Sequence, residues 1–317
     1  MRSELASAAL RIAWSQWTAL GVSGTVALPD HAVDLEALIA LTPVLRHEDP
    51  RLYDEARDWC VSQSQRLISL SRLRRLRAQL PEAACDAYDD FAATVNATAK
   101  PTTPWPTSRS ATKLVTSGKS QPADLSRFSL LQLRLRGLFG ITARAEVLVQ
   151  FLRPIMTQEL VPNTMLATAA FADLGYSKPA LAEVLAMLAK AGLLESWRRG
   201  NRDYYQLARG DALLALVGGG LPATAPTWTV RFRVLADLLI TEAATRDKKP
   251  TVQAIANLKI LESHHDALER IGVKPPAQGL GAAELASWAR HTLLDEPVPA
   301  SDEPVAAHAR RRVAAAR

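Results

Sequence analysis

The sequence predicts a mainly α-helical protein with one small β-hairpin near its middle. Apolar residues recur at helical spacing over most of the chain, whereas strand-like segments flank a glycine turn only in residues 193–207. Residues 100–123 contain four prolines, many Ser and Thr, and no acidic residue, which indicates a break between domains. The expected order is a helical domain (1–98), a disordered linker (99–123), a central domain (124–217), a helical C-terminal domain (226–295) and a disordered tail (296–317).

The composition is that of a globular protein. Hydrophobic residues make up 48% of the 317 residues and charged residues 22%. No apolar stretch reaches the roughly 18 residues that a membrane-spanning helix needs, so we expect no membrane partner. Cys60 and Cys85 match no metal or redox spacing, and so few cysteines indicate a reducing compartment. We therefore expect a cytoplasmic protein.

Positive charge is concentrated in the middle of the chain. Residues 1–98 carry 10 basic and 13 acidic side chains, whereas residues 124–209 carry 11 basic and 7 acidic ones, a net charge of +4. The net charge of the whole chain is +6. This asymmetry is consistent with a polyanionic partner for the central domain.

The first hundred residues carry local signals for helices. Asp34 has the position of an N-cap for residues 35–47, and Asp49 precedes Pro50 as a cap followed by a first-turn proline. Further apolar periodicity predicts helices over residues 5–17, 51–67, 69–80 and 82–98.

The central domain shows an ordered series of helices. Apolar stripes predict helices over residues 129–140, 142–154, 164–177 and 178–192. Gly175 suits the left-handed end of the third helix, and Pro179 lies in the first turn of the fourth. Two helices joined by a short turn that contains glycine form a helix-turn-helix arrangement.

A hairpin follows, and its tip reads Arg198-Arg199-Gly200-Asn201-Arg202. Glycine and asparagine tolerate the positive φ of a tight hairpin. The turn itself does not require the three arginines, which either contact a ligand or form a solvated turn.

The stretch LAKAGLLESWRRGNRDYYQL (residues 188–207) resembles the last helix and wing of ArsR- and MarR-like winged-helix transcriptional regulators. The likeness covers about residues 143–209 and implies a DNA-binding regulator. A recognition helix at about 177–191 would lie in the major groove, and the wing at about 194–207 would contact phosphates. The DNA-binding residues that the resemblance implies are Ser177, Lys178, Ala180, Glu183, Arg198, Arg199, Gly200, Asn201 and Arg202.

This sequence departs from the family in two respects. The module contains no cysteine or histidine, unlike metal-sensing members, and the loop at 154–163 is longer than usual. Only Lys178 and Lys190 are basic in the expected recognition helix, so phosphate binding is better supported than base readout.

The flanking helices leave several alternatives open. Residues 227–247, 251–272 and 282–294 are expected to be helical, and they offer apolar stripes. One stripe would either pair across a homodimer or pack into the chain's own core: Val234, Leu235, Leu238 and Leu239. A second functional class is a protein-interaction adaptor or antitoxin-like component that binds a partner protein through its winged helix or its N- or C-terminal helices.

Signals for catalysis are weak. The chain has no phosphate-binding Gly-Lys-Ser/Thr loop, no nucleophile elbow and no His-Glu-x-x-His motif, so we expect neither an enzyme nor a cofactor. An active site within the N-terminal helices is the remaining enzymatic alternative. The basic residues 72–77 either contact nucleic acid or form a solvated helix face. Asp54 and Asp58 lie one helical turn apart, but without a third ligand we expect a solvated acidic face and no metal.

Overall fold

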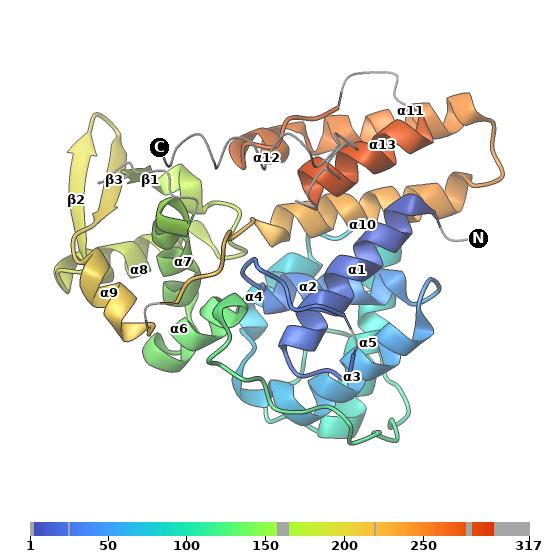
Figure 1. Cartoon of the computed structure of the whole chain (residues 1–317), viewed down its shortest axis with the longest axis horizontal. Helices are drawn as coiled ribbons and strands as arrows, with labels where there is room; N and C mark the ends of the chain where they lie inside the picture. The colour runs from blue at the N-terminus through green and yellow to red at the C-terminus, as the bar shows by residue number, and fades with distance from the viewer. Residues whose placement is uncertain (1–2, 25, 157–164, 219, 277–280, 295–317) are drawn as a thin grey trace, which may run out of the picture.

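Helices dominate the structure, as the sequence predicts. The computed structural model describes residues 3–24, 26–156, 165–218, 220–276 and 281–294. Of the described residues, 61% are helical, and a three-stranded antiparallel sheet accompanies the helices. The sheet belongs to the central domain, which lies to one side of the N- and C-terminal helices (Figure 1).

The helices of the first hundred residues begin at side-chain caps. Asp34 and Asp49 accept hydrogen bonds from backbone amides of the helices that follow them, as expected, and Ser3 and Ser69 do the same. Each cap satisfies amides that the helix leaves unpaired. The elements are α1 (Glu4–Ala19), α2 (Leu35–Leu41), η1 (Thr42–Leu45), α3 (Pro50–Gln63), η2 (Ser64–Arg66), α4 (Leu70–Arg77) and α5 (Glu82–Ala99).

Residues 100–123 differ from the expected disordered linker, because they lie against the N-terminal helices as an extended segment. Trp105 is only 4% exposed and its ring lies 6.3 Å from that of Phe91. The Asn96 side chain accepts from the Trp105 amide at 2.8 Å and donates to its carbonyl at 3.1 Å. One buried aromatic side chain thus supplies the apolar surface that the composition of the segment lacks.

Charge complementarity adds to this attachment. Arg109 pairs with Asp86 at 2.6 Å and with Asp90 at 2.7 Å, both on α5. Ser117 donates to the buried carboxylate of Asp58 from its amide and its hydroxyl. The segment has no acidic residue and the helices beneath it have an acidic excess, which explains why a polar sequence is held in place.

The C-terminal helices share a core with the N-terminal ones and do not form the separate domain that we expected. The apolar stripe proposed for a dimer is buried within this core, where Leu235 and Leu238 are 0% exposed. Those residues therefore offer no surface to a second copy. The elements are α10 (Trp228–Thr245), α11 (Pro250–Ser263), α12 (His265–Arg270), α13 (Ala282–Trp288) and the π-helical turn η5 (Ala289–Leu293).

A second hydrophobic core consists mainly of residues of the central domain, and Ala32 and Ala225 also belong to it. Its elements are α6 (Leu131–Phe139), α7 (Ala143–Met156), β1 (Leu166–Ala167), η4 (Thr168–Phe171), α8 (Lys178–Lys190), β2 (Leu194–Arg199), β3 (Arg202–Leu207) and α9 (Gly210–Leu216). The strand order is β1-β3-β2.

The helix expected over residues 164–177 is wrong in the part that the structure describes. Leu166 and Ala167 form β1 by pairing with Tyr205 and Tyr204 of β3, and only a short 3-10 helix follows. This pairing joins residues far apart in sequence, so helical periodicity could not reveal it. Gly175 does end the segment with φ 81°, as expected.

Trp105→Ala should destabilise the protein by about 3–5 kcal/mol, because it removes a buried aromatic ring from a packed site. Val115→Ala is a matched control in the same segment, since Val115 is 93% exposed, and it should change stability by less than about 0.5 kcal/mol. Urea unfolding measures both. Equal, small effects would mean that the segment is an unattached linker.

Candidate nucleic-acid interface

Helix α8 has one buried and one exposed face. Ser177 caps it by accepting from the Ala180 amide at 3.3 Å, and Pro179 occupies the first turn. The apolar stripe of Leu181, Val184, Leu185 and Leu188 is buried. Lys178 and Glu183 are exposed, whereas Ser177 and Ala180 are half-buried. The start of α8 therefore presents one cation and one acid to solvent.

The hairpin carries the arginines at its tip. Arg199 pairs with Arg202 across a two-residue turn formed by Gly200 and Asn201. Gly200 has φ 61°, but Asn201 does not have a positive φ, so only the glycine uses the conformation that we expected of both. A positive φ at the first central residue alone is the pattern of a type II′ turn.

The wing arginines have no structural partner within the described residues. Arg198, Arg199 and Arg202 are exposed, and none of their side chains makes a hydrogen bond or an ion pair there. Arg199 and Arg202 also face each other directly across the strands, and like charges in that position destabilise a hairpin. The charges of Arg199 and Arg202 therefore do not serve the stability of the hairpin, whereas Arg198 lies opposite Asp203 across the strands.

The turn before α8 is held by contacts from both flanks. Arg72 of α4 donates from Nε to the carbonyl of Leu174 at 2.7 Å. Thr229 of α10 donates to the carbonyl of Asp173 at 2.5 Å, and Arg270 of α12 pairs with the Asp173 carboxylate at 2.9 and 3.0 Å. The start of α8 is thus anchored to the N-terminal and the C-terminal helices.

Gly175 completes the anchoring of this turn. A Cβ atom at this position would lie 2.9 Å from the Leu76 side chain and 3.1 Å from that of Arg72. Glycine is required here both by its positive φ and by the close approach of α4.

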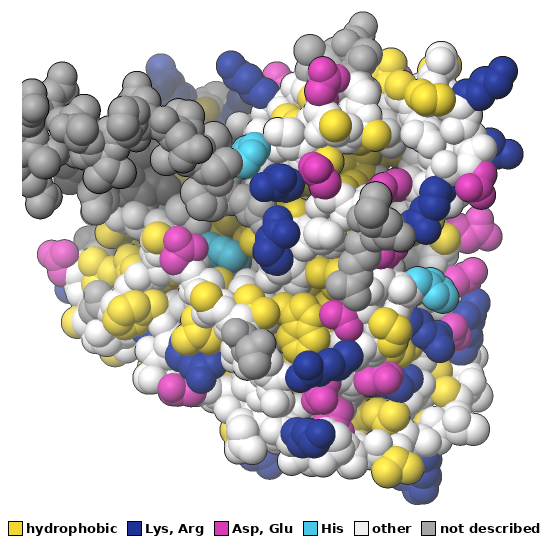
Figure 2. All heavy atoms as spheres, turned by 45° about the vertical axis from the view of Figure 1, so that its right-hand side comes forward, with side chains coloured by type: hydrophobic (Ala, Val, Ile, Leu, Met, Phe, Trp, Pro, Cys, Tyr) yellow, Lys and Arg dark blue, Asp and Glu magenta, His cyan; other side chains and the backbone are white. Residues whose placement is uncertain are grey.

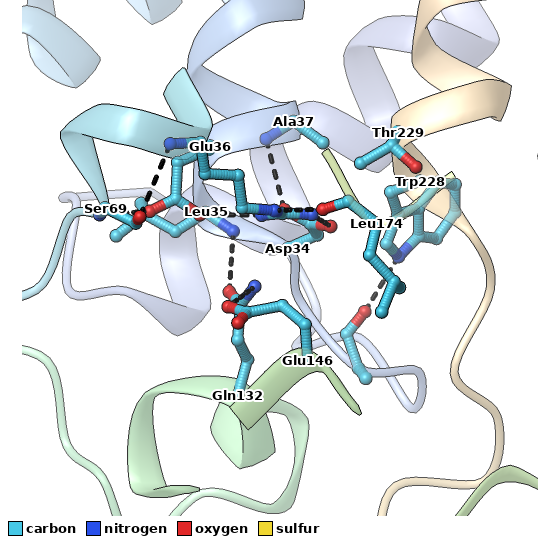
Figure 3. A network of polar contacts seen from close by, with 12 residues as sticks. Asp34, Leu35, Glu36, Ala37, Ser69, Gln132, Glu146, Leu174, Trp228 and Thr229 are labelled. Atoms are coloured by element: carbon cyan, nitrogen blue, oxygen red, sulfur yellow. Dashed lines mark hydrogen bonds and ion pairs between the residues drawn. The ribbon is translucent and has the colours of Figure 1, made fainter. Parts of the chain in front are cut away.

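A buried ionic network lies beneath this turn (Figure 3). Arg136 of α6 donates to Glu36 from both terminal nitrogens, at 2.7 and 2.8 Å, and to Glu146 of α7 at 2.5 Å. Arg72 donates to Glu36 at 2.7 Å and to both carboxylate oxygens of Asp34, at 2.5 and 2.6 Å. The side chains of Arg72, Arg136, Glu36 and Glu146 are at most 3% exposed.

Neutral groups complete the network. Gln132 donates to Glu146 at 3.0 Å and accepts from the Leu35 amide at 3.1 Å. The Ser69 amide donates to Glu36 at 2.7 Å, and the Tyr176 hydroxyl donates to Glu146 at 3.0 Å. Figure 3 shows Gln132 and Glu146 reaching up from the central domain toward Glu36. Each buried charge is thus paired and hydrogen-bonded, as burial requires.

The pKa values of the network reflect this pairing. Burial opposes the ionisation of Glu36, but Arg136 and Arg72 outweigh it and lower its pKa to about 2. Burial likewise opposes the charge of Arg72, yet Asp34 and Glu36 raise its pKa. Burial, with Glu146 beside it, raises the pKa of Tyr176. Glu36 and Arg72 are therefore charged at neutral pH, and Tyr176 is neutral.

The network supports a structural role. The cavity beside Asp34, Arg72 and Glu146 has a volume of about 30 Å³, which holds water but not a substrate. Sequence patterns did not predict this cluster, and Arg72 is a correction, because we expected residues 72–77 to contact nucleic acid or to form a solvated face. The available signals were single charges within apolar runs: Glu36 in LEALIAL and Arg136 in LLQLRLRGLF.

The acids considered for a metal site do not come together. Asp58 is buried and bound by Ser117, while Asp54 pairs with Arg57 at 2.7 Å. Elsewhere in the described residues, the ligand atoms of His265, Asp266 and Glu269 lie within 4.8 Å of one another on α12, and all three residues are exposed. Exposed acidic groups of this kind are common without a metal.

No family model, curated protein or solved structure matches this chain. Only the sequence and structure of this chain therefore bear on its function. On the face over the N- and C-terminal helices, basic and acidic side chains are interspersed (Figure 2). Within the described part of the chain, no helix is long and apolar enough to cross a membrane. The exposed arginines of the wing are the feature of the predicted DNA-binding module that its structure does not require.

Arg136→Leu should destabilise the fold by about 3–5 kcal/mol, because it leaves Glu36 and Glu146 buried without their shared cation. Arg74→Leu is the control, since Arg74 is exposed on α4. Chemical unfolding compares the two variants. A loss of less than about 1 kcal/mol for Arg136→Leu would contradict a role for the network in stability.

Acid should weaken the fold through Glu36. Its pKa of about 2 lies below the ordinary value of 4.5, so its ionisation stabilises the folded state above pH 4.5. That contribution is lost as the pH falls from 4.5 toward 2. The free energy of unfolding, measured across this window, should fall more steeply for the parent than for Glu36→Gln. Parallel curves would show that Glu36 is not the group responsible.

Proposed function

We propose that the protein is a DNA-binding transcriptional regulator whose central domain acts as a winged helix. The supporting observations are the element order and the sheet. Helix α7 is followed by β1, a short turn, α8 and the β2-β3 hairpin, and β3 lies between the other two strands. In a helix-turn-helix protein the second helix enters the major groove. Helix α8 would take that role here, with the short 3-10 helix η4 in the place of the first helix.

The proposed docking brings the start of α8 to the DNA. Lys178 is exposed at its first turn, where the helix dipole also favours a phosphate. Ser177 uses its hydroxyl oxygen as a cap acceptor, so its proton remains free to donate to a phosphate. Glu183 is exposed farther along the helix and is suited to accept from a cytosine amino group.

The wing supplies the observation that carries the proposal. Arg198, Arg199 and Arg202 are exposed at one tip, make no ion pair among the described residues, and include a cross-strand pair of like charges. Guanidinium groups bind phosphate oxygens with matched geometry. The Asn201 amide and the Gly200 backbone N–H are exposed beside them and suit further phosphate contacts.

A second candidate function is protein binding by the same domain. The outward side of α8 also contains Ala182, Ala186 and Met187, and Met187 is 39% exposed. Such a surface fits an apolar partner better than a base edge. In this alternative the domain serves an adaptor or antitoxin-like component, and the wing arginines would make no phosphate contacts.

Changing Arg198, Arg199 and Arg202 together to alanine should leave the fold intact and weaken duplex DNA binding. The slope of log affinity against log salt should shrink by about 0.9 for each phosphate that the variant no longer neutralises. Fluorescence anisotropy with a labelled duplex at several salt concentrations measures both quantities. Circular dichroism checks folding, because exposed substitutions cost little stability.

Changing Arg66, Arg74 and Arg75 together to alanine is the matched control, because it removes the same charge from exposed positions outside the wing. It should retain the parental slope. If this control loses affinity and the wing variant does not, the nucleic acid lies along α4 instead. If both bind as the parent does, the wing arginines form a solvated turn, which favours protein binding by the domain.

Lys178→Ala should have a different effect if Lys178 reaches a base edge. It should narrow the affinity difference between a preferred site and random duplex by about 1–3 kcal/mol while changing random-duplex affinity much less. Competition binding with the two duplexes measures this. Equal losses of affinity for the two duplexes would mean that Lys178 contacts a phosphate and not a base edge.

A further inference from the structure

The hairpin has an outer face that the core does not use. Residues that pair directly across strands share a face, so Trp197 lies beside Tyr204, with Arg199 and Arg202 next toward the tip. The opposite face carries Leu194 and Tyr205, which are buried in the core of the central domain. The aromatic pair and the arginine pair therefore point away from that core together.

Trp197 is unusual among the tryptophans of this chain. It is 42% exposed, whereas Trp17, Trp59 and Trp228 are at most 1% exposed. Within the described residues, the Trp197 indole N–H and the Tyr204 hydroxyl make no hydrogen bond. Ala167 of β1 lies on the other side of Tyr204 and is too small to cover the rings. Trp197, beside the half-buried Tyr204, thus presents an open aromatic surface next to unpaired cations.

We propose that this outer face stacks an unpaired nucleic-acid base on Trp197 and Tyr204 while Arg199 and Arg202 hold its phosphate. This inference rests on the proposed function and specifies a single-stranded ligand for part of the wing. Aromatic side chains beside a positively charged groove are the usual means of binding single strands. Bases within a duplex are already stacked and paired, so their faces are not accessible to the indole ring.

The arrangement of charge favours one position for the phosphate. Arg199 and Arg202 lie two residues beyond the aromatic pair, which is about 7 Å along a strand. Glu195 and Gln206 form the next pair on the other side, toward the base of the hairpin. The phosphate should therefore lie at the tip and the base over Trp197, because Glu195 repels a phosphate at the opposite end.

A direct test is titration with a 15-nucleotide oligo-dT, followed by tryptophan fluorescence and by anisotropy of a labelled strand. The parent should be quenched on binding, and Trp197→Ala should lose both the quenching and affinity, by roughly 5- to 100-fold. Trp197→Phe should recover much of the affinity, since a ring remains. Duplex affinity should change far less in both variants.

Leu216→Ala is the matched control, because Leu216 is a 59% exposed apolar residue of the same domain outside the hairpin. It should bind oligo-dT as the parent does. If Trp197→Ala also binds oligo-dT as the parent does while the wing-arginine variant loses duplex binding, the stacking proposal is wrong and the proposed function stands. If the parent binds neither oligo-dT nor duplex, both are wrong.

Discussion

The buried pairing of Glu36 with Arg136 and Arg72 is the constraint on which the arrangement of this protein depends. Two cations and their carboxylates lie at the junction of α2, α4, α6 and α7. A buried charge without its partner costs several kcal/mol. A shift of one helix against the others would break several of these bonds together, so the network holds the four helices in one arrangement. All five guanidinium donors of Arg136 are positioned for acceptors, including the carbonyl of Leu67. The N-terminal helices and the central domain are therefore joined by directional bonds that fix one geometry.

This constraint extends to the functional surface that we propose. The turn at 173–176 receives Arg72 from one flank and Thr229 and Arg270 from the other, and Ser177 then begins α8. The orientation of α8 is thus set by helices outside the central domain as well as by its own buried stripe. The wing differs, because its tip is free of such contacts and its arginines are unpaired in the described residues. A rigid helix beside an exposed cationic hairpin is an arrangement suited to an extended polyanion.

The sequence predicted what depends on neighbours in the chain and missed what depends on distant ones. The caps at Asp34, Asp49 and Ser177 and the turns at Gly175 and Gly200 follow from local backbone requirements, and all are present. Strand β1, the attachment of Trp105 and the buried network were missed. Arg72 bonds to a carbonyl 102 residues away, and Arg136 to a carboxylate 100 residues away. The exposed wing residues could be named from sequence because a hairpin tip is local. The residues that position α8 could not be named from sequence, because Arg72, Thr229 and Arg270 lie far from it in the chain.

DNA binding by the central domain can be tested by hydrogen–deuterium exchange of the parent protein, with and without a saturating DNA duplex. It reports every backbone amide without altering a side chain. The duplex should slow exchange at the start of α8, near Lys178, and at the wing tip around Gly200. Protection confined to the N- or C-terminal helices, with the segment from 177 to 207 unchanged, would contradict DNA binding by the central domain.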